Sequence, residues 1–399
     1  MRMIIGTDTF APDVNGASYF TQHLASGLAA RGHEVHVLCP STDRSSGTFT
    51  RADGVVEHRV AAVRTPFHPT FRVVRPAVAV RDARRLVASV APDVVHVQGH
   101  FPIGRALLRS ARSSGIPVVA TNHFMPENLL GYVPGLPAAA ARRVKAWAWR
   151  DFARVFDGAN VVTTPTPIAA ALLEPLELRP PVLAVSCGVD LDRFRPRSRP
   201  TARWRGLPDK PTVLFVGRLD VEKRIGDLVD ALALVRSDVD AQLVLVGTGG
   251  QRDALAARAA AAGVAGNVHF CGFVPDDELA EAYAACDVFA NAGVAELQSL
   301  VTMEAMAAGR PVVAADAVAL PHLVRHGENG FRFAPGDVAA AAAHLRLLLT
   351  DPTVRARMGT ASRVQIAQHS LDASLARFEQ IYADAAERPV RAPLAAAAA

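Results

Sequence analysis

Residues Glu296–Gly309 read ELQSLVTMEAMAAG. From Ser299 onwards the residues are good helix formers, Ser299 is a suitable N-cap, and Gly309 followed by Pro311 is a stop signal. Nearly all other positions of this helix are apolar, so we expect it to be buried on most sides. Glu304 lies in its middle, and a buried carboxylate requires a hydrogen-bonding partner.

That partner is either a ligand hydroxyl or a group of the protein, such as a backbone N–H or an arginine. Glu296 lies in the loop before the helix, where it either contacts a ligand or is a solvated acid. The first-turn N–H groups of a helix attract phosphate. The stretch therefore offers amides to an anion and two carboxylates to hydroxyl groups.

Composition limits the classes of protein to consider. The 399 residues, half of them hydrophobic, suffice for two domains. A net charge of +5 suits an anionic ligand or membrane surface, and no basic-aromatic cluster typical of nucleic-acid binding stands out. The four cysteines form no CxxC pair, which argues against a zinc site or a disulfide framework. The opening MRMIIGTDTF enters a strand directly, unlike a signal peptide, and no apolar run is long enough for a membrane span. We therefore expect a cytoplasmic protein, or one peripheral on the inner membrane face.

Short apolar segments alternate with helical ones in the first half of the chain. Met3–Asp8 leads through the loop Thr9–Gly16 into a helix at Ala17–Ala30. Such alternation predicts right-handed βαβ units in a parallel sheet. Further buried strands are expected at Glu34–Pro40, Asp93–Gly99, Pro117–His123, Asn160–Thr166 and Pro181–Ser186.

The same alternation restarts after a polar, proline-containing segment at 197–210, which we interpret as a linker. We therefore expect an α/β protein with two Rossmann-like doubly wound domains that face a central cleft, a first domain at 1–196 and a second at 211–370. A last helix at 371–387 is expected to pack back on the first domain, and 388–399 to form a disordered tail. Strands of the second half are expected at Thr212–Val216, Gln242–Gly247, Asn267–Phe273, Asp287–Asn291, Pro311–Asp316 and Gly330–Phe333.

Basic side chains follow the first strand of the second half. Arg218 comes directly after that strand and its glycine, and Lys223 follows in the same loop. Cations at the carboxyl end of a parallel strand suit a diphosphate, arginine as a planar fork and lysine as a point charge. A solvated basic loop is the alternative.

Two positions in the first half are further candidates. His123 closes the strand PVVATNH and either donates to a substrate oxygen or caps a loop. Gly16, between the first strand and first helix, permits a positive φ and close approach to a phosphate, or forms a simple turn. Val246–Gly250 reads VGTGG rather than GxGxxG, which argues against a dehydrogenase.

Two regions mix basic and aromatic residues, Arg59–Arg85 and Arg142–Arg154. Such mixtures suit an anionic membrane surface. Solvated helix faces whose aromatic residues belong to the core are the alternative.

Together these stretches resemble family 4 of the retaining glycosyltransferases, which have the two-Rossmann GT-B architecture. The resemblance covers nearly the whole chain and implies a hexosyltransferase that uses a nucleotide-diphosphate sugar as co-substrate, with neither cofactor nor metal. It rests on RGHEV (Arg31–Val35), SCGVDLDRFRP (Ser186–Pro196), VGRLDVEK (Val216–Lys223), and the pair Glu296 and Glu304 with seven residues between them.

The resemblance implies that 1–196 is the acceptor-side domain and 211–370 the nucleotide-sugar domain. It also implies a role for each matching position. The donor phosphates would lie against the backbone of Gly16, the side chains of Arg218 and Lys223, and the amides of Ser299 and Leu300. These cations and amides would stabilise the charge that grows on the leaving nucleoside diphosphate.

The sugar-binding positions follow in the same way. Glu304 would bind ribose hydroxyls, Glu296 the hydroxyls of the transferred sugar, and His123 the sugar near the reacting centre. The catalytic residues implied are His123, Glu296, Arg218 and Lys223.

Two departures leave the donor open between UDP-glucose and GDP-mannose types. Gln298-Ser299 stand where the family often has Phe-Gly, and His322 where many members have glutamate. Thr121–Tyr132 looks most like members that glycosylate lipids, so we expect a membrane lipid acceptor such as diacylglycerol or phosphatidylinositol. A small soluble sugar or aminocyclitol is the alternative acceptor, and a nucleotide-sugar epimerase or a non-catalytic sugar-nucleotide-binding module is the alternative function.

Overall fold

The computed structural model describes residues 1–65, 71–125, 137–196 and 204–387. The chain forms two compact units, Met1–Ser186 with Asp372–Ala399 (unit 1) and Cys187–Leu371 (unit 2). The predicted tail, the first part of the predicted linker and the loop residues 126–132 lie outside the described residues. Within the described part, no helix is both long and apolar enough to cross a membrane.

Unit 1 is built on an eight-stranded sheet that is parallel except at one edge, where β3 pairs antiparallel with β4. The inner strands are short valine-rich runs buried on both faces, as expected where helices cover both sides of a parallel sheet. In sheet order the strands are β10 (Val182–Ala184), β9 (Val161–Thr164), β8 (Val118–Thr121), β7 (Val94–Val97), β1 (Arg2–Gly6), β2 (Glu34–Pro40), β4 (Val56–Val60) and β3 (Gly47–Thr50).

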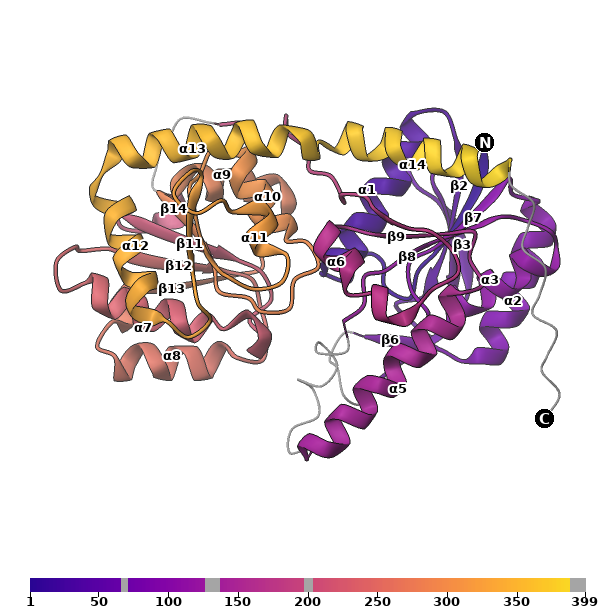
Figure 1. Ribbon diagram of the computed structural model, residues 1–399, viewed down its shortest axis with the longest axis horizontal. Coiled ribbons are helices and arrows are strands. Elements are labelled where there is room, and N and C mark those ends of the chain that lie inside the picture. The colour runs from indigo at the N-terminus through magenta and orange to yellow at the C-terminus, as the bar shows by residue number, and fades with distance from the viewer. Residues whose placement is uncertain (66–70, 126–136, 197–203, 388–399) are drawn as a thin grey trace. The chain divides into compact units, whose positions relative to one another are not determined.

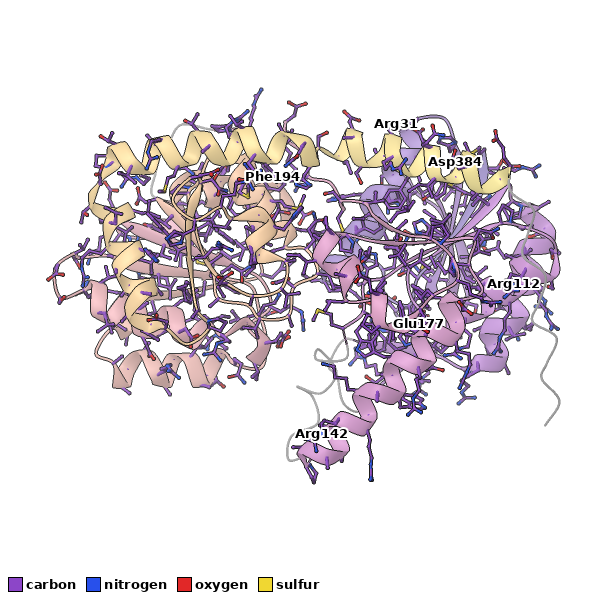
Figure 2. The ribbon with its side chains drawn as sticks, in the orientation of Figure 1. Arg31, Arg112, Arg142, Glu177, Phe194 and Asp384 are labelled. Carbon is purple, nitrogen blue, oxygen red and sulfur yellow. The ribbon has the colours of Figure 1, made fainter. Side chains whose placement is uncertain are left out.

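The helices of unit 1 include the last helix of the chain, α14 (Leu371–Ala386), which runs alongside α1 (Figure 1). Phe378 of α14 contacts Phe20 of α1, with ring centroids 5.6 Å apart. Arg31, labelled beside α14 in Figure 2, pairs with Glu379. The other elements are α1 (Gly16–Ala30), α2 (Pro76–Val90), α3 (Pro102–Ser113), α5 (Ala138–Phe156), α6 (Pro167–Ala171), η1 (Glu174–Leu176) and a hairpin of β5 (Ala62–Arg64) and β6 (Arg72–Val74).

Unit 2 is built on a six-stranded parallel sheet. In sheet order its strands are β13 (Val268–Gly272), β12 (Gln242–Val246), β11 (Thr212–Val216), β14 (Val288–Asn291), β15 (Val312–Ala315) and β16 (Gly330–Phe333). The helices of this unit are η2 (Trp204–Gly206), η3 (Val221–Lys223), α7 (Ile225–Val235), α8 (Arg252–Ala261), η4 (Ala265–Asn267), α9 (Asp276–Ala285), α10 (Leu300–Ala307), α11 (Leu320–Leu323), α12 (Val338–Thr350), α13 (Pro352–Ile366) and η5 (Ala367–His369).

The first unit ends at Ser186, before the boundary expected at residue 196. The segment between these positions belongs to unit 2 because its side chains enter the core of that unit. Phe194 packs edge-on against Tyr283, with ring centroids 5.7 Å apart, and Val189 bridges to Ser370.

Candidate active site

The strand order of unit 2 has a switch point between β11 and β14. From β11 the sheet continues through β12 to β13, and from β14 it continues the other way through β15 to β16. The loops after β11 and β14 therefore diverge at the carboxyl edge of the sheet. In open α/β sheets this is where ligands bind.

A lysine and a glutamate from these two loops meet at the switch point. Lys223 Nζ donates to Glu296 Oε1 at 2.6 Å, and the two side chains are only 16% and 12% exposed. The Val294 N–H donates to the Glu222 carbonyl at 3.0 Å and ties the loops together. Gly293 leaves room for the pair, since a Cβ there would lie 3.2 Å from Glu296 Oε1. The structure thus brings together a predicted phosphate cation and a predicted sugar-binding carboxylate.

Arg218 is held by two acids of its own loop. Its guanidinium pairs with Asp220, and its Nη2 donates to Glu222 Oε1 at 2.8 Å. Neither acid was predicted as a partner, because Arg218 and Asp220 lie outside any helix and no helical spacing marks the contact. A diphosphate would compete with both carboxylates for a guanidinium that is already oriented and 30% exposed.

The VGTGG segment after β12 supports the Arg218 loop. The Leu219 N–H donates to the Thr248 carbonyl at 2.9 Å, and a Cβ on Gly249 would lie within 2.6 Å of the Leu219 backbone. These glycines therefore permit one loop to pack directly on another. This packing explains why the segment is rich in glycine without dinucleotide binding.

Helix α10 begins at Leu300 with Ser299 in the N-cap position, but the Ser299 side chain does not cap the helix. Its Oγ accepts instead from Asn291 Nδ2 at 3.0 Å and from Thr302 Oγ1 at 2.9 Å. The predicted N-cap position is confirmed, but the side chains of Asn291 and Thr302 engage the hydroxyl instead of a backbone N–H. The first turn of α10 therefore receives no hydrogen bond from Ser299 Oγ. The N–H groups of this turn are the ones predicted to bind phosphate.

Glu304 finds its partner in Tyr283 of α9. Tyr283 Oη donates to Glu304 Oε2 at 2.7 Å. Burial raises the pKa of Glu304 to about 7, against the lowering effects of the Tyr283 hydrogen bond and of Arg193. A tyrosine hydroxyl thus takes the place of the backbone N–H or arginine predicted as protein partners, and no local pattern marks Tyr283.

In unit 1, Gly16 is the first residue of α1 and Asn15 caps it, accepting from the Ser18 N–H at 2.9 Å. Gly16 does not use the positive φ that glycine permits, because helical geometry starts at this residue. A Cβ there would meet nothing within 4 Å, so open space borders it.

His123 follows β8, and its Nε2 lies 2.8 Å from Gln98 Oε1. Burial lowers its pKa to about 4, so the imidazole is neutral near pH 7. Gly16 and His123 belong to unit 1, whereas Arg218, Lys223, Glu296, Ser299, Leu300 and Glu304 belong to unit 2.

The two basic-aromatic regions differ in the structure. Arg59 and Arg72 pair internally, with Glu57 and Asp13, and are 14% and 13% exposed. They are therefore unsuited to a surface role, and Phe67 of that region lies outside the described residues. The second region forms α5, and its amino-terminal part is exposed.

The chain is similar to known glycosyltransferases along most of its length. Residues 14–193 match the model of Glycosyltransferase Family 4, and residues 199–365 match that of Glycosyl transferases group 1. A GDP-mannose-dependent alpha-mannosyltransferase of Mycobacterium tuberculosis is 34% identical over 86% of this chain and 88% of its own length.

Two further similarities come from one relative and one solved structure. A GDP-mannose-dependent alpha-(1-6)-phosphatidylinositol monomannoside mannosyltransferase of Mycobacterium tuberculosis is 32% identical over 91% of this chain and 92% of its own length. Sucrose-phosphate synthase from Thermosynechococcus elongatus superimposes with a TM-score of 0.80 at 22% identity, covering 96% of this chain and 99% of that one, which shows the GT-B fold. The chain therefore belongs to family 4 of the glycosyltransferases.

Proposed function

We propose that this glycosyltransferase moves a mannosyl group from GDP-mannose to a hydroxyl of a membrane lipid, with retention of the anomeric configuration. The observation that carries the proposal is the contact between Lys223 and Glu296 at the switch point, where a cation for phosphate meets a carboxylate for sugar. The two mycobacterial relatives support GDP-mannose as donor by their names, and one of them supports a phosphatidylinositol-based acceptor.

In this proposal unit 2 binds the donor. Arg218, Lys223 and the first-turn amides of α10, which begin at Ser299 and Leu300, stabilise the negative charge that grows on the departing GDP. Glu304 accepts hydrogen bonds from the ribose hydroxyls, and Glu296 from the hydroxyls of the transferred mannose. We assign no protein base, because the departing diphosphate oxygen is a basic group able to take the proton of the acceptor hydroxyl.

In this proposal unit 1 binds the acceptor. Gly16 would lie near a donor phosphate, as open space at its α-carbon permits, and His123 would contact the transferred sugar.

Donor choice is tested with a thermal-shift panel of GDP-mannose, UDP-glucose and ADP-glucose. A ligand that binds only the folded state raises the melting temperature. We expect the largest shift with GDP-mannose. A response to UDP-glucose alone would overturn the donor assignment.

Acceptor and reaction type are tested with labelled GDP-mannose and a set of acceptors. Label entering phosphatidylinositol or a diacylglycerol glycolipid, with the α-linkage confirmed by NMR, supports the proposal. Label entering only soluble sugars or inositol would overturn the lipid acceptor. Conversion of the donor hexose without any acceptor would indicate an epimerase.

We further propose that α5 docks on an anionic bilayer, which makes the protein peripheral on the inner membrane face. Trp147, 62% exposed, lies on one helical stripe with Arg143, Arg150 and Arg154, all exposed, while Phe152 faces the core. Between residues 138 and 150 the helix has no acidic side chain. Figure 2 shows Arg142 at the end of α5 that lies away from the sheet. Tryptophan inserts at the headgroup level, and each arginine near an anionic surface contributes about 1 kcal/mol.

Sedimentation with phosphatidylglycerol-containing vesicles tests this surface. Replacing Arg143 and Arg150 by glutamine should weaken binding about 10- to 30-fold, because two such contributions are lost. The matched control replaces Arg84 and Arg85 of α2, which are exposed without an exposed aromatic residue on that helix. Equal weakening by both pairs, or equal binding to phosphatidylcholine vesicles, would overturn the α5 surface.

A further inference from the structure

A buried chain of polar contacts connects His123 to the last helix of the protein. His123 Nε2 lies 2.8 Å from Gln98 Oε1, the Gln98 amide lies against His96 of β7, and His96 Nδ1 lies 2.7 Å from Tyr382 Oη of α14. Gln98, His96 and Tyr382 are 5%, 1% and 0% exposed. All four side chains belong to unit 1.

The geometry around His96 determines which way the Gln98 amide points. Gln98 Nε2 lies 3.4 Å from one ring nitrogen of His96 and 3.3 Å from the other. Nearly equal distances place this nitrogen over the face of the ring, because an in-plane position would bring it too close to the carbon between the two nitrogens. The in-plane positions are already taken by Tyr382 Oη at 2.7 Å and Thr121 Oγ1 at 2.6 Å.

The face of an aromatic ring is electron-rich and attracts an N–H group. The Gln98 NH₂ group therefore faces His96, and its carbonyl oxygen faces His123. The opposite orientation would place oxygen lone pairs against the ring face of His96 and is disfavoured.

This orientation assigns the proton of His123. A carbonyl oxygen only accepts, so His123 Nε2 must carry a hydrogen to donate to Gln98. Burial keeps the imidazole neutral, and a neutral ring has one proton. Nδ1 of His123 is then a hydrogen-bond acceptor. A substrate group that meets Nδ1 must therefore be a hydrogen-bond donor.

We propose that Gln98, His96 and Tyr382 are positioning residues that hold His123 in the Nε2–H tautomer, so that its Nδ1 accepts a hydrogen bond from a hydroxyl of the transferred hexose. The hydroxyl partner rests on the proposed function, whereas the tautomer stands on the geometry of unit 1. An acceptor nitrogen selects a hydroxyl, which can donate, over an ether or carbonyl oxygen, which cannot.

The tautomer is tested in the full chain by NMR with ¹⁵N-labelled histidine, and the His123 signals are assigned by their loss in His123→Gln. We expect the wild-type spectrum to show a protonated Nε2 and an unprotonated Nδ1. Gln98→Leu should give a mixture of tautomers, because leucine offers no acceptor. A wild-type signal from protonated Nδ1 would overturn the proposal. This reading does not depend on turnover, so it is separate from failure of the proposed donor or acceptor.

Kinetics then test the link to the helix. Tyr382→Phe keeps the ring and removes only the hydroxyl, and it should lower kcat about five- to tenfold, as expected for one lost hydrogen bond. The donor KM should change little. The matched control is Ser374→Ala, which removes another hydrogen bond of α14, from Ser374 Oγ to the Ser186 carbonyl. Equal kcat in Tyr382→Phe and wild type, or an equal loss in Ser374→Ala, would show that the hydroxyl serves stability alone.

Discussion

Replacing Lys223 by methionine gives a quantitative test of the donor site. The ammonium lies 2.6 Å from Glu296 Oε1, and both side chains are mostly buried. At the effective dielectric of such a position, unit charges 4 Å apart attract by about 4 kcal/mol. A bound phosphate gains only part of this attraction energy, because Glu296 already neutralises the ammonium of Lys223. A hydrogen bond to a charged group has a net value of about 1.5–3 kcal/mol.

We therefore expect Lys223→Met to raise the Kd for GDP about 10- to 150-fold, measured by calorimetry. The matched control is Lys210→Met. Lys210 pairs with Asp240 at 2.8 Å and precedes β11, so it lies at the amino edge of the same sheet, away from the site. The control removes the same charge and should leave the Kd unchanged. An unchanged Kd in folded Lys223→Met, or an equal rise in the control, would refute the assignment of Lys223 to the diphosphate.

Glu296→Gln completes the comparison. It removes the carboxylate that competes for Lys223, so the Kd for GDP should not rise, while transfer of the hexose should slow. A loss of GDP affinity as large as that of Lys223→Met would contradict separate roles for the two side chains.

Two further predictions concern neighbouring residues. The pKa of Glu304 is raised from 4.5 to about 7, so between these values the folded protein retains a proton that the unfolded chain has lost. The free energy of unfolding should therefore decrease more steeply with rising pH in wild type than in Glu304→Gln. Urea denaturation at about pH 5 and pH 7 measures this decrease. An equal decrease in both proteins would contradict the raised pKa of Glu304. Gly249→Ala should destabilise the fold by about 1–3 kcal/mol because its Cβ would overlap the Leu219 backbone. Gly250→Ala, where a Cβ meets open space, is the control, and equal melting temperatures for both variants would contradict the loop packing.

Local patterns predicted the main strands well. Glu34–Pro40, Thr212–Val216 and Gly330–Phe333 begin and end where expected. Four strands, β3 to β6, were not predicted. β4 reads VEHRV and β6 only RVV, so neither shows the continuous apolar run that marks a strand buried on both faces.

Local sequence alone identifies the side chains that are available for chemistry. Arg218 and Lys223 follow a predicted strand, and Glu296 and Glu304 flank the start of a predicted helix, because helix and strand signals act over a few residues.

The groups that these side chains contact are specified by the packed fold. Lys223 pairs with Glu296, Glu304 accepts from Tyr283, and Gln98 determines the proton of His123. Each partner lies in a helix or in a loop that follows a different strand, and strand order brings it within hydrogen-bonding distance. Local sequence does not encode that order, because it results from packing the whole sheet against its helices.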